Sequence, residues 1–186
     1  NFSEIEKHTR GGGGQKRQAT RVSLYLHAHN IYNKIKDALR EVSADLNQEK
    51  RILTFLIASL AGGTGCGTFI DFAFMIHQIK KDLNIEAMTL IGIFLLPGGF
   101  EGIKIDTREK NLMNSNCFAA FREMVRFIFV GDYTITYQTG IKASLTNTRL
   151  FDVVYLIDGS NIVDESGKQA PHYLGSCPAI ADFILY

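Results

Sequence analysis

The chain of 186 residues has 46% apolar and 21% charged residues, which is typical of a globular domain with a sizeable core and excludes a disordered chain. The formal net charge of +1 gives no reason to expect a nucleic acid or a membrane surface as a partner. No apolar run reaches the roughly 18 residues that a membrane helix needs, so membrane insertion is not expected either.

The chain begins with Asn1 and a polar stretch without a leading strand, which predicts one domain cut from a longer protein. Residues 10–21, RGGGGQKRQATR, form a glycine-rich basic loop. Residues 19–46 follow with one apolar stripe at three- and four-residue steps, which predicts an amphipathic helix. Its members are Tyr25, Ala28, Tyr32, Ile35, Leu39, Val42 and Leu46.

Residues 51–60, RILTFLIASL, form a short continuous apolar run, which is how a strand buried on both faces reads. The glycine-rich sequence AGGTGCGT comes directly after it. Apolar residues at helical spacing then predict a helix that starts near Thr68 and ends near Asn84.

A second buried strand is predicted over residues 87–97 and a third over residues 151–158. Between them lie a polar loop, a helix over residues 108–128, and an alternating segment, 133–145, that predicts a two-stranded hairpin around Gly140. The predicted apolar face of the 108–128 helix consists of Leu112, Phe118, Phe121, Met124, Val125 and Ile128. Pro171 starts a last predicted helix, which runs to Tyr186.

Apolar strands that alternate with helices predict an α/β domain, in which a parallel sheet carries helices on both faces. Ligands of such sheets lie beyond the carboxyl ends of the strands. The run of glycines stands at one of these ends and opens a helix, where exposed N–H groups and the helix dipole favour phosphate. The competing interpretation is a tight turn that binds nothing.

The common phosphate-loop patterns do not fit this run. A Walker loop needs Lys and Ser or Thr after the last glycine, where this chain has Thr68 and Phe69, and the dinucleotide pattern needs a different glycine spacing. A nucleophilic Cys66 is a further alternative, since a helix N-terminus lowers a thiol pKa. The histidines have no ligand spacing, so no metal site is predicted. The three cysteines are far apart, and a reducing cytoplasm is the expected location.

The hexapeptide GGTGCG resembles the signature of the tubulin superfamily, GGTG-(Ser/Thr)-G, and Cys66 stands where the family has a hydroxyl donor. Residues 9–21, TRGGGGQKRQATR, resemble the glycine-rich loop of bacterial FtsZ, including an Arg seven residues after the last glycine, here Arg21. The resemblance implies that both segments bind phosphate. The implied residues are Gly62, Gly63, Thr64, Gly65, Cys66 and Gly67 in the first, and Gly12, Gly13 and Gly14 in the second.

The resemblance continues downstream and covers nearly the whole chain. In LLPGGFEGIK, Glu101 matches the family residue that reaches the ribose, although Ile105 stands where the family has an Arg. After the third strand, Asn161 matches a residue that contacts guanine, and Asp182 is the candidate for a second base contact. The 133–145 hairpin reads as an insertion, which makes the chain most similar to the divergent bacterial tubulin-like proteins.

The resemblance implies a Rossmann-like domain that binds GTP or GDP with Mg²⁺ and self-associates head-to-tail in its parent protein. Hydrolysis in the family needs an acidic loop from the neighbouring subunit, so no catalytic residue is expected in this chain. The family's first phosphate loop would precede Asn1. Two alternatives stay open: a nucleotide-binding scaffold without turnover, and an enzyme that depends on Cys66.

Overall fold

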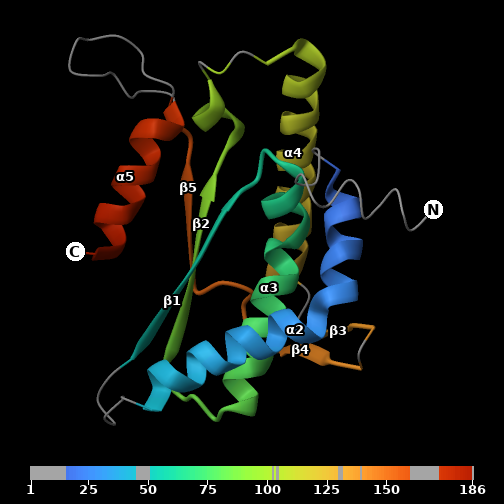
Figure 1. Ribbon diagram of the computed structural model, residues 1–186, viewed down its shortest axis with the longest axis vertical. Helices are drawn as coiled ribbons and strands as arrows, with labels where there is room; N and C mark the ends of the chain where they lie inside the picture. The colour runs from blue at the N-terminus through green and yellow to red at the C-terminus, as the bar shows by residue number, and fades with distance from the viewer. Residues whose placement is uncertain are drawn as a thin grey trace.

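The computed structural model describes residues 16–44, 51–101, 103, 105–129, 132–138, 140–159 and 172–185. Its centre is a parallel sheet of three strands in the order β1–β2–β5 (Figure 1). Strand β1 (Ile52–Ser59) pairs with β2 (Met88–Leu95) along its whole length, and β2 also pairs with β5 (Val153–Ile157). Helix-containing connections separate these strands along the chain, as parallel pairing requires.

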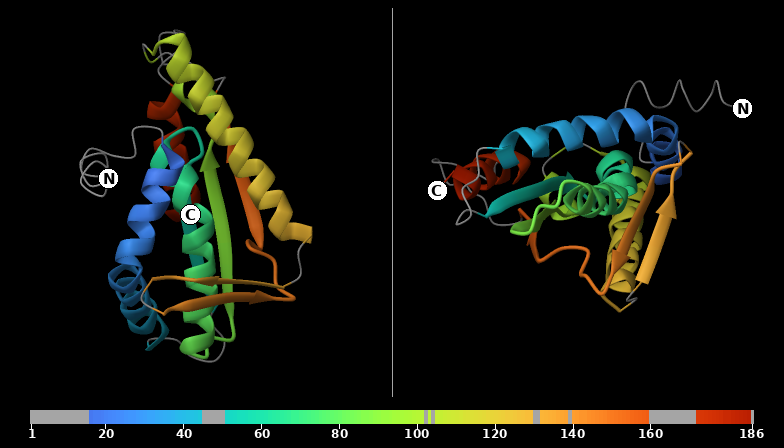
Figure 2. Two further views of the ribbon diagram at one scale, coloured as in Figure 1. Left: turned by 90° about the vertical axis from the view of Figure 1, so that its right-hand side faces the viewer. Right: turned by 90° about the horizontal axis from the view of Figure 1, so that it is seen from below.

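Helices cover both faces of this sheet (Figures 1 and 2). Helices α2 (Arg17–Ala44), α3 (Gly63–Asp82) and α4 (Thr107–Phe129) lie on one face, and α5 (His172–Leu185) lies on the other. The predicted α/β class is therefore confirmed. No helix among the described residues is long and apolar enough to cross a bilayer.

Helix α3 is the centre of the core and packs against α2, α4 and β1. Phe69 and Phe74 are buried, and each belongs to an aromatic cluster, as expected for core residues. The Phe69 ring lies 5.1 Å from that of Phe94, and the Phe74 ring lies 5.3 Å from that of Phe127. These clusters fix α3 to β2 on one side and to α4 on the other.

The predicted hairpin exists as an antiparallel pair, β3 (Asp132–Thr136) and β4 (Lys142–Thr146), separate from the main sheet. The connecting turn closes with a hydrogen bond from Tyr137 N to Ile141 O of 2.9 Å. Gly140 has φ of 77°, a left-handed conformation that favours glycine. The pair lies across α3, so the hairpin is part of the fold around the glycine-rich helix (Figure 2).

Burial differs from the prediction on the two outer strands. The middle strand β2 is largely buried, but Leu53 and Ile57 of β1 are 56% and 52% exposed, and most of β5 is exposed. The prediction that these strands are buried on both faces is wrong, because β1 and β5 are the edges of the sheet and only α5 covers its second face among the described residues.

Helix α4 buries a face that overlaps the predicted one only in part. Met124 is buried and Phe121 is partly buried against the core, as predicted, but Leu112, Phe118 and Val125 are exposed. The buried positions are Met113, Asn116, Cys117, Ala120, Met124 and Phe127. Cys117 and Ala120 on this face are small, whereas the prediction followed the bulky side chains. When a helix has two partly apolar faces, its sequence alone does not show which face is buried.

Helix α3 also begins earlier than predicted, at Gly63 instead of near Thr68. Most of the glycine-rich motif is therefore the first turns of the helix and not a loop before it. Glycine has a low helix propensity, but tertiary packing overrides it here, as the contacts of Gly65 and Gly67 show below.

Candidate functional site

The glycine-rich motif lies at the carboxyl edge of the sheet, where β1 passes into α3. Leu60 N donates to Leu95 O of β2 at 2.9 Å, and Ala61 N donates to Ser59 Oγ at 3.1 Å. Gly62 is the N-cap of α3, with an extended backbone and no side-chain cap. The strand therefore ends in a short, hydrogen-bonded turn that leads into the N-terminus of α3 at the carboxyl edge of the sheet.

The N-terminus of α3 has the electrostatics of an anion site. Helix geometry leaves the N–H groups of the cap and first residues without an acceptor inside the helix. Among the described residues, no acceptor outside the helix bonds the N–H of Gly62 or Gly63. The first turn of this 20-residue helix carries no acid, and its last turn carries Lys80 and Lys81. The positive end of the dipole is thus left for an anion.

The glycines of the motif have different roles. A Cβ at Gly65 would lie 2.5 Å from Ser59 O, and one at Gly67 would lie 2.6 Å from Arg17 O. Both positions therefore require glycine because other backbone passes too close. A Cβ at Gly62 would meet nothing within 4 Å. Open space beside the motif thus lies at Gly62, whereas Gly65 and Gly67 serve packing.

Cys66 faces the core and not the sheet edge. Its side chain is 1% exposed, and Sγ donates to Asn116 O at 3.0 Å. Burial raises the pKa of Cys66 to about 11, so the thiol is neutral at physiological pH. The geometry therefore argues against a Cys66 nucleophile. The exchange of a family hydroxyl for this thiol also removes no donor from the sheet edge, because the side chain at this position points inward.

Asn116 of α4 holds the turn in place and was missed by the sequence analysis. It is 8% exposed, and its Nδ2 donates to Ala61 O at 3.3 Å while its own carbonyl accepts from Cys66 Sγ. In the sequence, the only sign of this role is that Asn116 lies between Met113 and Ala120, on the face of α4 that is buried. Asn116 could be identified only if the buried face of the helix were known.

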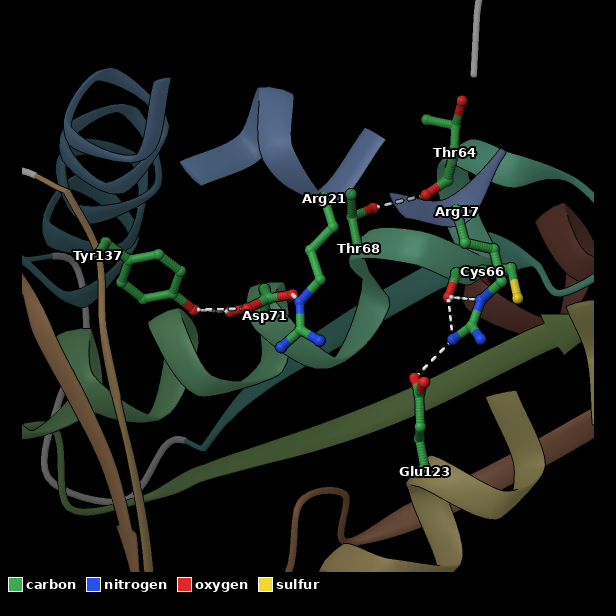
Figure 3. A network of polar contacts seen from close by, with 8 residues as sticks. All are labelled: Arg17, Arg21, Thr64, Cys66, Thr68, Asp71, Glu123 and Tyr137. Atoms are coloured by element: carbon green, nitrogen blue, oxygen red, sulfur yellow. Dashed lines mark hydrogen bonds and ion pairs between the residues drawn. The ribbon is translucent and has the colours of Figure 1, made fainter. Parts of the chain in front are cut away.

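Two arginines of α2 bind α3 beside the motif (Figure 3). The Arg17 guanidinium donates to Cys66 O at 3.3 and 3.2 Å and pairs with Glu123 of α4. Arg21 Nε lies 3.0 Å from Oδ2 of Asp71, which is 1% exposed. Arg21 therefore pairs between two helices, although its side chain is 44% exposed. Asp71 was not predicted, although it is a lone charge within the apolar run FIDFAFMI.

The ends of β2 and β5 form the neighbouring part of the sheet edge. After β2, a short 3₁₀ helix, η1 (Pro97–Phe100), carries Gly98, whose missing Cβ leaves room for the Asp158 carboxylate at the end of β5. A cleft of about 520 Å³ lies along η1 and the start of α4. Glu101 lines this cleft with Lys110, so the predicted ribose ligand does face a cleft.

The remaining predicted ligands are not brought to this edge within the described residues. Gly12, Gly13, Gly14 and Asn161 lie outside the described residues. Asp182 is exposed in the second half of α5, about 15 Å along the helix from His172, and α5 runs away from the carboxyl edge (Figure 1). In the part of the chain that the structure describes, no three His, Cys, Asp or Glu side chains gather as a metal site.

Comparison with known proteins gives one informative result. Neither the curated proteins nor the solved structures compared with the chain give a match. The model of a protein family described as tubulin-like matches residues 3–185, which is almost the whole chain. The glycine-rich helix at the carboxyl edge of the sheet lies within that match, and the chain belongs to the tubulin-like family.

Proposed function

We propose that this domain binds a guanine nucleotide, with its phosphates at the N-terminus of α3. Helix geometry leaves the N–H groups of Gly62 and Gly63 without an acceptor inside α3, and the open space at Gly62 leaves room for a ligand to approach the backbone. Membership of the tubulin-like family supports GTP as the nucleotide. The observation that carries the proposal is this uncapped helix N-terminus, free of acid in its first turn, at the carboxyl edge of a parallel sheet.

Other predicted ligands extend this proposal. Thr64 is exposed beside Gly62, and Gly12, Gly13 and Gly14 precede α2 in the sequence, while the first turn of α2 is bound to α3. Glu101, in the neighbouring cleft, is the proposed ribose contact, and Asn161 the proposed base contact. Mg²⁺, bound with the nucleotide, would neutralise phosphate charge. The three cysteines are free, which agrees with a reducing cytoplasm as the location.

Turnover is proposed to need a second subunit. Two carboxylates beside the motif are already paired with arginines of α2: Asp71 with Arg21 and Glu123 with Arg17. Neither is therefore proposed as the acid that activates water. An acid supplied by the next subunit in a head-to-tail assembly would complete the site, and heterologous contacts of this kind produce filaments.

Nucleotide binding is tested with two substitutions at Gly62. Gly62→Ala and Gly62→Val place a side chain where the structure is open, so each should change the free energy of unfolding by less than about 1 kcal/mol. The dissociation constant for GTP, measured by calorimetry on the full-length protein, should rise about tenfold for Ala and further for Val. Asn30→Ala, an exposed change on α2, is the control and should leave the affinity unchanged. Unchanged affinity in both Gly62 variants would contradict the site.

Hydrolysis is tested by its dependence on protein concentration. The GTPase rate per molecule of the full-length protein should rise with concentration if assembly completes the site. Bound GTP that stays intact at all concentrations would instead favour the nucleotide-binding scaffold. ATP, measured in parallel, tests the guanine preference.

A further inference from the structure

Asp71 joins three separate parts of the molecule at one buried carboxylate (Figure 3). Arg21 of α2 approaches Oδ2 at 3.0 Å, and the Tyr137 hydroxyl, at the end of β3, donates to Oδ1 at 3.1 Å. The same hydroxyl lies 3.3 Å from Asp71 O. Figure 3 shows the arginine and the tyrosine reaching the carboxylate from opposite sides. Its two oxygens are thus shared between α2 and the hairpin.

The burial of this group makes its partners important. Asp71 and Tyr137 are each 1% exposed, whereas the Arg21 side chain is 44% exposed. Burial raises the pKa of the Asp71 carboxyl, and the Arg21 charge acts in the opposite direction. A buried carboxylate is tolerated only with such partners. Burial also raises the pKa of the Tyr137 hydroxyl, which therefore stays protonated and can only donate to the carboxylate at neutral pH.

The hairpin that supplies Tyr137 is fixed to α3 at a second place. Lys81 Nζ donates to Ser144 O at 2.8 Å, and Ser144 N donates to Gln78 Oε1 at 3.3 Å. The Tyr137 ring also packs on the Tyr25 ring of α2, with 4.9 Å between the ring centroids. The hairpin therefore contacts both helices and has little freedom to move relative to α3.

Arg21 in turn fixes the start of α2 near the glycine-rich motif. It lies one helical turn after Arg17, whose backbone touches Gly67 and whose guanidinium binds Cys66 O. The first two turns of α2 are thus held against the first turns of α3 at two successive levels. Arg17 binds within the motif, at Cys66, and Arg21 binds Asp71, which also accepts from Tyr137 of the hairpin.

We infer that Tyr137 is a positioning residue for the nucleotide site, because its hydroxyl orients Asp71, and Asp71 holds Arg21 and the first turns of α2 beside the N-terminus of α3. The hairpin thereby acts on the site from a distance and touches no ligand itself. This inference rests on the proposed function, since it assigns the hairpin a role in nucleotide affinity.

The test is Tyr137→Phe in the full-length protein, which removes the hydroxyl and keeps the ring that packs on Tyr25. Amide hydrogen exchange of residues 17–24 should accelerate roughly fivefold, the factor that corresponds to one hydrogen bond, while residues 73–79 of α3 keep their rates. The dissociation constant for GTP should rise by a similar factor. Tyr133→Phe is the matched control. It also removes a tyrosine hydroxyl from the hairpin, but the ring of Tyr133 packs on Phe74 and Phe127 and not on Tyr25.

A second variant separates positioning from general loss of stability. In an Asp71→Asn background, Tyr137→Phe should add little to the change in hydrogen exchange or in GTP affinity, because the variant no longer provides the carboxylate that links Tyr137 to Arg21. The inference would be overturned if the effects of Asp71→Asn and Tyr137→Phe on hydrogen exchange and GTP affinity were additive. It would also be overturned if Tyr137→Phe and Tyr133→Phe changed these quantities equally. If the wild-type protein bound no GTP, the proposed function would be wrong, and the exchange rates alone would then support or overturn the positioning role.

Discussion

Replacing Gly67 with alanine should destabilise the protein, although a glycine-to-alanine change in the interior of a helix is usually stabilising. Alanine is about 1 kcal/mol more favourable than glycine in a helix interior. At Gly67, however, the new Cβ would lie 2.6 Å from Arg17 O and 3.1 Å from Arg17 Cα. These are backbone atoms, so the overlap is relieved only if the first turn of α2 moves away from α3.

The magnitude follows from opposing contributions. Overpacking of this kind costs about 1–3 kcal/mol. Displacing Arg17 also weakens its charged hydrogen bonds to Cys66 O, which are worth about 1.5–3 kcal/mol in buried settings, and the partial exposure of this group reduces that value. After the gain in helix propensity, we expect a net loss of about 1–3 kcal/mol in the free energy of unfolding, and a fall in Tm of roughly 3–10 °C.

Urea unfolding of the wild-type protein, Gly67→Ala and Gly62→Ala measures this loss. Gly62→Ala is the internal control, because its Cβ meets nothing within 4 Å and should cost less than about 1 kcal/mol. A Gly67→Ala protein about 1 kcal/mol more stable than wild type would show that only helix propensity acts there, and would refute the close approach of α2.

Three further predictions concern buried side chains. Burial lowers the pKa of His77 below its usual 6.5, so on acidification the unfolded chain takes up a proton before the folded protein does. The free energy of unfolding should therefore fall as the pH drops below about 6.5. His77→Gln should reduce this fall, measured by urea unfolding at two pH values. Iodoacetamide at about pH 8 should label the exposed Cys177 well before Cys66, because the thiol of Cys66 is buried and neutral; equal labelling of the two by mass spectrometry would contradict the burial of Cys66. Cys66→Ser should leave GTP affinity within about twofold of wild type, whereas a tenfold loss would place this side chain at the ligand.

The order of elements and the class of the fold could be predicted from the sequence, because periodicity and glycine positions are local signals. The strand β1 was placed within one residue at each end, and the hairpin turn was found at Gly140. The same local logic failed for the start of α3. There, contacts of Gly65 with β1 and of Gly67 with α2 decide the conformation, and neither contact is visible in the motif itself.

The polar framework around the motif could not be predicted for a related reason. Asp71 is 50 positions from Arg21 and 66 from Tyr137, so its partners were not identifiable from spacing. Asn116 lay on a helix whose buried face had been assigned to Phe118 and Val125, both of which are exposed. In each case, one polar residue within an apolar stretch was the signal, and only the tertiary fold shows what it binds.

The most direct test of the account is a crystal structure of the full-length protein with GTP. The account predicts phosphate oxygens within about 3 Å of the N–H groups of Gly62 and Gly63, with Gly65 and Gly67 still packed on β1 and α2. A nucleotide whose phosphates lie elsewhere, with no anion at the N-terminus of α3, would contradict it.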